Sequence, residues 1–294
     1  MPFVATLVAP ADAANLGDAL VRRAAQAIPG VVSSEIIEPG VAADIVYHGG
    51  PEARGALEAL LTPERIDVIV QDAATRGKKL ILADMDSTLI GQECIDELAA
   101  EAGVGAYVAE ITERAMRGEI PFEGALRERV ALLRGVPEST IAKLLETRIT
   151  LNPGARVLFR TMRAHGARTA IVSGGFTPFT GAIAARIDAH EHRANRLVME
   201  SGALTGAVIE PILGREAKLA ALEELIASHS LAREATLAVG DGANDLAMLG
   251  AAGLGVAYRA KPKVAAAAAA RLEFADLTAL LYAQGFKRRD FVLD

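Results

Sequence analysis

Short apolar runs that end in polar or glycine-rich turns recur through most of the chain. Runs this short, bounded by turn residues, are typical of strands buried on both faces of a parallel sheet. They lie at Leu80–Ala83, Arg168–Val172, Ala235–Val239 and Leu254–Ala257. Between them, apolar residues recur at helical spacing and predict helices at Ala155–His165, Thr177–Ile187 and Gly214–Ala227. The alternation predicts an α/β protein with a parallel-sheet core.

The rest of this core region carries weaker patterns. A hairpin is predicted from Arg196–Met199 and Ala203–Ile209, and a last helix from Leu277–Gln284. Alanine is the strongest helix former, so the alanine run at Ala265–Ala270 is read as a tightly packed helix. The five histidines show no metal-ligand spacing beyond the pair His190 and His192, and are interpreted as surface residues.

The first 76 residues follow a different order. Their patterns predict strands at Phe3–Val8, Val31–Ile37, Ala43–Tyr47 and Ile66–Val70, with helices at Ala13–Ala27 and Pro51–Leu61. The order βαββαβ is the ferredoxin-like plan, and at this size it resembles the ACT-like domains of amino-acid metabolic enzymes. That resemblance implies an amino-acid effector or a homodimer, whereas a purely structural module is the alternative. The polar stretch 71–78 is the candidate linker.

Composition narrows the class of protein. The chain has 294 residues, of which 51% are hydrophobic and 23% charged, so a globular protein of about two domains is expected. A net charge of −6 gives no reason to expect nucleic-acid binding. There is no membrane-length apolar run or basic N-terminal signal region, and the one cysteine, Cys94, allows no internal disulfide. We expect a cytoplasmic protein.

Polar residues follow three of the predicted core strands. Asp84 and Asp86 end the first, Ser173 and Gly174 the second, and Gly240-Asp241-Gly242-Ala243-Asn244-Asp245 the third. Open α/β sheets bind ligands at the carboxyl ends of their strands. Two carboxylates held close together need a cation or a shared proton, and Asp241 and Asp245 offer the hard oxygen ligands that suit Mg²⁺. Ser173 and the glycines suit a phosphate oxyanion.

These motifs, with Lys218 early in a helix, resemble in order the four motifs of the haloacid dehalogenase (HAD) superfamily of phosphatases. Residues 79–285 are similar to the phosphoserine phosphatases of that superfamily. The resemblance implies a HAD-like Rossmannoid parallel-sheet core, preceded by the ferredoxin-like domain. Residues 97–149 have almost no strand signals and several helical stripes, which predict a helical cap. The expected division is 1–76 and 77–294, with a core of 77–95 and 150–294 and a cap of about 96–149.

The resemblance also implies roles for individual residues. Asp84 is the expected nucleophile and Asp86 the general acid and base. Mg²⁺ is expected on the Asp84 side chain, the Asp86 main-chain carbonyl and Asp241, with Asp245 in the outer shell. The residues expected to contact the phosphoryl group are Ser173, Gly174, Lys218 and Asn244.

The cap, together with the loop that leads into it, is expected to select the substrate. Arg129 suits a carboxylate, because guanidinium binds it in a bidentate fork, and Glu93 suits an ammonium group. Met116 and Phe122 are expected to line the pocket. Together these residues predict hydrolysis of O-phospho-L-serine to serine and phosphate, the last step of serine biosynthesis.

Two alternatives remain at this point. Water could be replaced by an acceptor alcohol such as homoserine, which would make the protein a phosphotransferase. The chain could instead be an amino-acid-sensing regulator with an inactive core, but the intact catalytic motifs argue against that reading.

Overall fold

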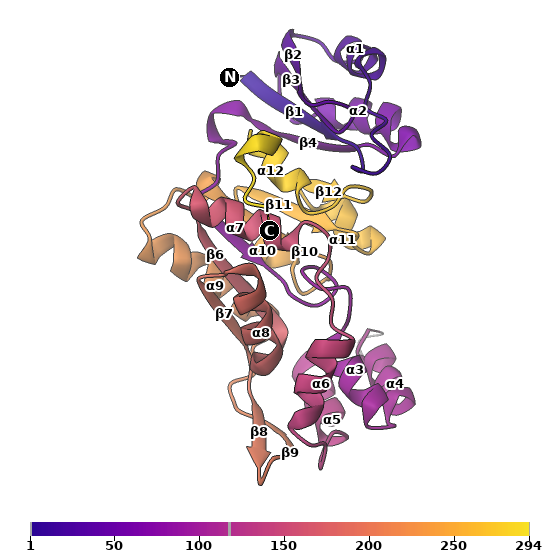
Figure 1. The fold of residues 1–294 in the computed structure, drawn as a ribbon, viewed down its shortest axis with the longest axis vertical. Helices are drawn as coiled ribbons and strands as arrows, with labels where there is room; N and C mark the ends of the chain where they lie inside the picture. The colour runs from indigo at the N-terminus through magenta and orange to yellow at the C-terminus, as the bar shows by residue number, and fades with distance from the viewer. Residues whose placement is uncertain (1, 117–118, 294) are drawn as a thin grey trace.

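The computed structural model describes residues 2–116 and 119–293, with the side chain of Met116 left out. At its centre lies a parallel sheet of order β12-β11-β10-β5-β6-β7 (Figure 1). Its strands are β5 (Leu80–Ala83), β6 (Arg168–Phe176), β7 (Glu191–Asn195), β10 (Thr236–Gly240), β11 (Leu254–Tyr258) and β12 (Ala270–Leu272). β5, β10 and β11 are wholly buried, as their apolar sequences predict.

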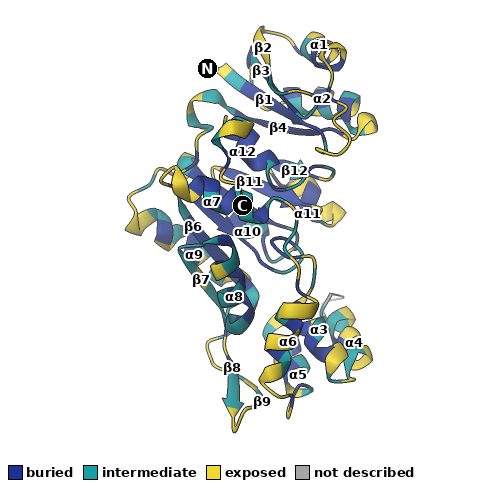
Figure 2. Cartoon of the chain, in the orientation of Figure 1, coloured by how far each residue is buried: buried dark blue, intermediate teal, exposed yellow. Residues whose placement is uncertain are grey.

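Helices cover both faces of this sheet, and its central strands are buried between them (Figure 2). Successive strand residues point to opposite layers. Ile81 and Ala83 face one layer, whereas Leu80 and Leu82 face the other. The first layer contains α7 (Ala155–Ala164), α8 (Thr177–Ile187) and α12 (Ala279–Ala283). The second contains α9 (Arg215–Ser228), α10 (Leu246–Ala251) and α11 (Pro262–Ala267). The HAD-like core predicted from the sequence is confirmed.

The two edge strands differ from the prediction. β7 was not predicted, because its sequence Glu-His-Arg-Ala-Asn is polar and pairs on one side only, with β6. The predicted helix over Ala265–Ala270 is wrong at its end, since α11 ends at Ala267 and Ala270 begins β12. Ala270 pairs with Val256 of β11 and is fully buried, so tertiary pairing overrides the helix propensity of alanine.

Four helices follow β5 and stand apart from the core, at the lower right of Figure 1. They are α3 (Cys94–Glu101), α4 (Gly105–Met116), α5 (Phe122–Ala131) and α6 (Ser139–Thr147). The hairpin of β8 (Leu197–Glu200) and β9 (Ala203–Val208) packs against them, because Gly135 N–H donates to Leu204 O (2.8 Å) and Glu138 N–H donates to Gly202 O (2.9 Å). The helical insertion and the hairpin agree with the sequence.

The N-terminal residues form an antiparallel sheet of order β2-β3-β1-β4. Its elements are β1 (Pro2–Val8), α1 (Asp18–Gln26), β2 (Val31–Glu38), β3 (Ala42–His48), α2 (Ala53–Leu61) and β4 (Asp67–Asp72). The ferredoxin-like plan is confirmed. The first helix begins at Asp18 and not at Ala13, because Ala14 has a left-handed φ of 45° and Leu16 bridges to Gly40.

Stretch 71–78 is not a free linker. Gln71 Nε2 donates to Ala283 O (2.8 Å), and Arg76 donates to Tyr282 O (3.0 Å) and to Asp44 Oδ2 (2.7 Å). Asp67 adds a third connection, accepting the backbone N–H groups of residues 273, 274 and 275. The ferredoxin-like sheet therefore lies directly on α12 and the end of β12 (Figure 1).

Among the residues that the structure describes, we find no helix long and apolar enough to cross a membrane.

Candidate active site

The polar motifs predicted at three strand ends meet at the carboxyl edge of the core sheet. β5 lies between β6 and β10, and Ala83 is in register with both Ile171 and Val239. Asp84 and Asp241 follow β5 and β10, and Ser173 lies near the end of β6, so the three lie at nearly the same level. β6 runs on to Phe176, past the end predicted at Val172. The cap helices lie beyond this edge in Figure 1. The fold thus places the candidate chemistry between core and cap.

Asp84, Lys218 and Asp245 form a buried ionic cluster. Lys218 Nζ lies 2.6 Å from both Asp84 Oδ2 and Asp245 Oδ1, and its side chain is only 1% exposed. Burial raises the pKa of Asp84 well above its usual range, and Asp245 adds to the rise, whereas Lys218 opposes it. Burial lowers the pKa of Lys218, but the two carboxylates outweigh it and hold that pKa above its ordinary value. The lysine is a fixed positive charge at this strand end.

Asp86 has different partners from Asp84, although it is only two residues away. Its Oδ1 accepts Cys94 N–H (3.1 Å), and its Oδ2 accepts Ser173 Oγ–H (3.3 Å). Burial and the nearby Glu93 carboxylate together raise the pKa of Asp86 to about 6. A carboxyl group with a pKa near neutrality can both give and take a proton.

The loop between β5 and α3 brings Glu93 back toward the aspartates. Ser87 turns this loop with a left-handed φ of 53°, and its Oγ–H donates to Glu93 Oε1 (2.6 Å). Thr88 is fully buried and donates to Asp241 Oδ1 (3.0 Å), which ties the loop to β10. Burial raises the pKa of Glu93, while the Ser87 hydrogen bond opposes that rise.

Three carboxylates offer a ligand set for a divalent cation. Oxygen atoms of Asp84, Asp241 and Asp245 all lie within 4.8 Å of one another. Lys218 supplies one positive charge against these three acidic groups. Burial raises the pKa of Asp241 to about 6, and the negative charge of Asp245 adds to that rise. Hard oxygen donors with uncompensated negative charge suit Mg²⁺. The side chain of Asp86 points elsewhere, so only its main chain is available to such an ion.

The cap supplies Phe122 and Arg129. Phe122 lies over the end of β6, because a Cβ atom added at Gly174 would meet its Cζ at 3.3 Å. Arg129 is partly buried and donates to Ala125 O (3.3 Å) and Thr112 Oγ1 (3.4 Å), both within the cap. Burial lowers the pKa of Arg129, whereas the charges of Asp96 and Glu93 oppose that change. The predicted side-chain role of Met116 lies outside the described residues.

Asn244 folds back over its own loop. A Cβ atom added at Gly242 would lie 2.2 Å from Asn244 Oδ1, so only glycine fits there without moving the amide. Gly242 N–H donates to Asp245 Oδ2 (2.9 Å), which fixes the same turn. The structure thus brings Asn244 to the strand edge that holds Asp241 and Asp245.

Two residues near this site were not predicted from the sequence. Asn152 donates through Nδ2 to Thr88 O (2.8 Å) and Ile90 O (3.1 Å), which ties the return from the cap to the loop after β5. Lys261 lies in the loop after β11, and its charge acts on Glu93. Its position after a buried parallel strand could have identified it, because that loop leaves the same edge of the sheet.

Comparisons with known proteins agree with this geometry. A sequence profile described as haloacid dehalogenase-like hydrolase matches residues 81–250. The phosphoserine phosphatase SerB2 of Mycobacterium tuberculosis is 43% identical over 79% of this chain and 57% of its own length. The phosphoserine phosphatase of Haemophilus influenzae is 46% identical over 69% of this chain and 64% of its own length. The chain thus spans less than two thirds of these curated relatives.

Solved structures give the same result. A HAD-family hydrolase of Salmonella enterica serovar Typhi has a TM-score of 0.86 at 27% identity, covering 96% of this chain and 98% of that one. A substrate-bound phosphoserine phosphatase has a TM-score of 0.65 at 41% identity, covering 70% of this chain and 97% of that one. With the family profile spanning more than half of its residues, the chain belongs to the haloacid dehalogenase-like hydrolase family.

Proposed function

We propose that the protein hydrolyses O-phospho-L-serine to L-serine and phosphate in a Mg²⁺-dependent reaction, as the last step of serine biosynthesis. The observation that carries the proposal is the pair Asp84 and Asp86, which stand two residues apart with different partners. One is held beside a buried lysine, and the other has a pKa near neutrality. Phosphoryl transfer through a carboxylate needs these two roles.

Asp84 acts as the nucleophile. Its carboxylate oxygen attacks phosphorus, the bond from phosphorus to the seryl oxygen breaks, and an aspartyl phosphate forms. Asp86 protonates the departing seryl oxygen, since its raised pKa keeps a proton available near neutral pH. Water then attacks the aspartyl phosphate, Asp86 takes the proton from that water, and phosphate leaves.

Hydrogen-bond donors fixed by the fold stabilise the negative charge on the transferring phosphoryl oxygens. Lys218 already lies beside Asp84, and Ser173 and Gly174 lie at the end of the neighbouring strand. Asn244 approaches from the loop after β10. Donors held in place before the reaction stabilise the transition state with little reorganisation.

Magnesium fits the carboxylates at this edge. The Asp84 and Asp241 side chains and the Asp86 main-chain carbonyl would hold it, with Asp245 in the outer shell. When bound, the ion supplies positive charge that offsets the phosphoryl oxygens and the nucleophile.

Glu93 and Arg129 select the amino acid. The two side chains carry opposite charges, and each charge opposes the pKa shift that burial causes in the other. Glu93 lies in the loop after β5, and Arg129 lies on α5. Glu93 receives the ammonium group of phosphoserine, and Arg129 receives its carboxylate. Phe122 contributes to the apolar lining. A phosphoserine phosphatase captured with substrate, 41% identical to this chain, supports the choice of ligand.

The N-terminal domain extends the proposal. We assign residues 1–76 to an ACT-like unit that binds an amino-acid effector or pairs in a homodimer, and residues 77–294 to the phosphatase with its cap at about 96–149. The proposed location of the enzyme is the cytoplasm, where serine is made.

The test is phosphate release from a panel of phosphoserine, phosphothreonine, phosphoethanolamine and p-nitrophenyl phosphate, with Mg²⁺ and with EDTA. We expect strong preference for phosphoserine and loss of activity in EDTA. Broad activity would contradict the selection by Glu93 and Arg129. Turnover that requires an acceptor alcohol such as homoserine would replace hydrolysis by phosphotransfer.

A further inference from the structure

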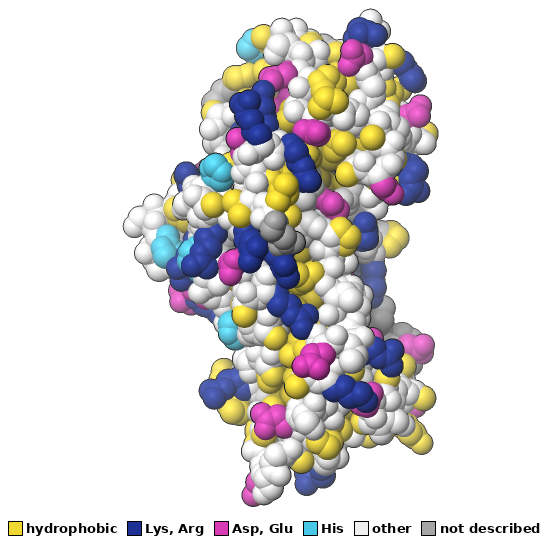
Figure 3. Space-filling view, viewed as in Figure 1, with side chains coloured by type: hydrophobic (Ala, Val, Ile, Leu, Met, Phe, Trp, Pro, Cys, Tyr) yellow, Lys and Arg dark blue, Asp and Glu magenta, His cyan; other side chains and the backbone are white. Residues whose placement is uncertain are grey.

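A basic hollow lies at the opposite edge of the core sheet from the candidate active site. Its volume is about 350 Å³, and it is lined by Lys79, Arg163, Gly166, Ala167, Arg168, His190, His229 and Leu231. Lys79 and Arg168 stand just before or at the start of β5 and β6, the strands that end near Asp84 and Ser173. No carboxylate is among these lining residues. Basic and histidine side chains gather at the left edge of the core in Figure 3.

Arg168 has a donor without a partner. Its Nη2 donates to Glu191 Oε2 (3.2 Å), which orients the guanidinium. Its Nε is buried and has no hydrogen-bond partner among the described residues. Because Nε is buried, the part of Arg168 that a ligand in the hollow can reach is the outer guanidinium, whose side chain is 32% exposed.

His190 is fixed as a second donor. Its Nδ1 accepts the backbone N–H of Thr169 (3.2 Å) and lies 2.9 Å from Thr169 Oγ1. An Nδ1 that accepts from a backbone amide carries no proton, so the neutral ring carries its proton on Nε2. Burial lowers the pKa of His190, and the positive charges of Arg163, Arg168 and His229 lower it further against the opposing Glu191. The ring is therefore a neutral N–H donor beside the hollow.

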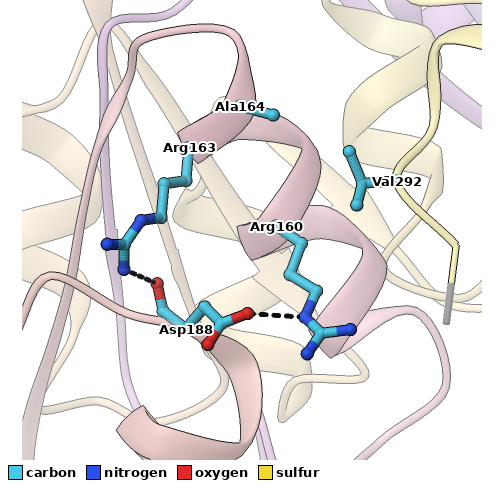
Figure 4. Close-up of a pocket in the computed structure, with 5 residues that line it drawn as sticks. All are labelled: Arg160, Arg163, Ala164, Asp188 and Val292. Carbon is cyan, nitrogen blue, oxygen red and sulfur yellow. Dashed lines mark hydrogen bonds and ion pairs between the residues drawn. The ribbon is translucent and has the colours of Figure 1, made fainter.

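Arg163 is held in place from the opposite side. Figure 4 shows it on α7 beside a smaller cavity of about 290 Å³, together with Arg160 and Asp188. Its Nη1 donates to Asp188 O (2.8 Å), while Arg160 pairs with the Asp188 carboxylate (2.7 Å). Because Asp188 is paired with Arg160, it leaves most of the charge of Arg163 uncompensated. Glu191 is likewise shared, since it also binds Arg193 (3.1 Å).

We propose that this hollow binds a dianionic phosphate group, either free phosphate or the phosphate of a small phosphorylated metabolite, as a second anion site of the protein. Lys79, Arg163 and Arg168 supply positive charge, of which Glu191 offsets part at Arg168, and the Arg168 guanidinium and His190 Nε2 supply donors. Guanidinium groups match phosphate oxygens in a fork, and the hollow is larger than phosphate alone requires. This site does not depend on the proposed hydrolysis, because binding here needs no turnover.

Binding would hold the amino ends of the three central strands together. Lys79 N–H donates to Ala235 O (2.7 Å), and Arg168 N–H donates to Lys79 O (2.8 Å). An anion bound by Lys79 and Arg168 therefore bridges the strands whose other ends carry the candidate catalytic residues.

The direct test follows the histidine side-chain nitrogens by NMR in protein labelled with nitrogen-15 histidine, in EDTA. His190→Gln assigns the resonance of His190, and inorganic phosphate is the first probe. We expect a saturable shift of the His190 Nε2 signal at millimolar phosphate. Lys79→Gln combined with Arg163→Gln removes two exposed charges and should weaken this response at least about tenfold. Arg148→Gln is the matched control, because this arginine is 59% exposed on the cap and far from the lining residues.

The outcomes separate the alternatives. A His190 signal that does not move, or that moves equally in the double variant, overturns the proposal. Malonate serves as a dicarboxylate of equal charge, and equally tight binding of malonate would overturn the assignment to phosphate. Tighter binding of glycerol phosphate than of inorganic phosphate would identify a phosphorylated metabolite as the ligand, whereas equal binding would identify free phosphate. Arg168→Gln should weaken binding of either phosphate probe in a protein whose folding is checked by its melting temperature.

Discussion

Asp84 and Asp86 show how neighbouring residues of one type acquire different chemistry. The sequence places them two apart at the end of a buried strand, and this spacing was enough to predict a paired-carboxylate site. What separates them comes from the fold. Lys218 arrives from α9 to pair with Asp84, whereas the amide of Cys94 and the hydroxyl of Ser173 reach Asp86. The contacts that Lys218 and Asn152 make at the site could not be read from spacing, because they depend on tertiary packing.

The two aspartates should respond differently to removal of their charge. We expect Asp84→Asn to abolish phosphate release, because the amide oxygen is a poor nucleophile. Asp86→Asn should lower kcat by roughly 10²–10⁴-fold, the usual contribution of a general acid and base. Steady-state phosphate release measures both, with Glu146→Gln on the exposed side of α6 as the control. Substantial turnover by Asp84→Asn would disprove the assignment of the nucleophile.

Lys218 should matter for stability as well as for chemistry. Lys218→Met leaves Asp84 and Asp245 buried without their cation, and losing one partner of a buried ion pair costs about 3–5 kcal/mol. Urea unfolding measures this loss, and added Mg²⁺ should restore part of it by binding the same carboxylates. Lys143→Met removes a 59%-exposed lysine that pairs with Glu101 on the cap, and should cost far less than Lys218→Met because solvent screens that pair. An equal loss in the two variants would contradict the buried-cluster interpretation.

At the scale of elements, strands buried on both faces were predicted well and the edge strands poorly. The apolar runs of β5, β10 and β11 identified the core, because central strands bury both faces. β7 is polar, and β12 (Ala-Arg-Leu) begins at the last residue of the alanine run, so the local sequence does not mark either strand, and each is fixed by pairing with the preceding strand of the sheet. The cap helices were predicted from their apolar stripes, but their placement over β6 was not.

The end of β6 gives a test of how tightly this element is built against Asp86. A Cβ atom at Gly175 would lie 2.6 Å from Asp86 Oδ2, so Gly175→Ala must displace that carboxylate. We expect kcat to fall at least about tenfold, since small displacements of catalytic groups are costly. Gly250→Ala in α10 is the control, because nothing lies within 4 Å of an added Cβ atom there. Unchanged kcat in Gly175→Ala would show that Asp86 can move freely.

At the scale of the whole molecule, the two sheets are joined by buried polar contacts. Lys78 lies at the junction, where its Nζ donates to Thr75 O (2.8 Å) and Glu234 O (2.9 Å). Burial lowers the pKa of Lys78 to about 8, against the opposing charges of Glu234 and Asp72. The polar composition of 71–78 predicted a linker but not this burial, because the surfaces that cover it come from the far end of the chain.

This lowered pKa predicts the direction of a pH effect on stability. As the pH rises from about 8 toward 10.5, folded Lys78 loses its proton while the unfolded lysine keeps it, so the unfolded state binds more protons. Stability contributed by this residue therefore rises with pH across that range. Across this pH range, the unfolding free energy of wild type should therefore rise by on the order of 1–2 kcal/mol relative to that of Lys78→Met. Denaturant unfolding at several pH values measures it.

The neighbouring lysine provides the control for that experiment. Lys79 is exposed, so Lys79→Met controls for the loss of a lysine next to this stretch without opening a buried site. Curves for wild type and Lys78→Met that stay parallel across the range would show that Lys78 titrates normally in the folded protein.

The contacts of Asp67 have a consequence for the order of synthesis. The ferredoxin-like domain leaves the ribosome before the core and cap, yet the backbone amides that donate to Asp67, and the α12 helix on which its sheet rests, are made after them. Its docking face therefore stays uncovered while the entire core and cap are translated. A nascent chain that stops before Glu273 leaves the Asp67 carboxylate without these partners. Synthesis of residues 273–283 is thus the event that joins the ferredoxin-like domain to the core.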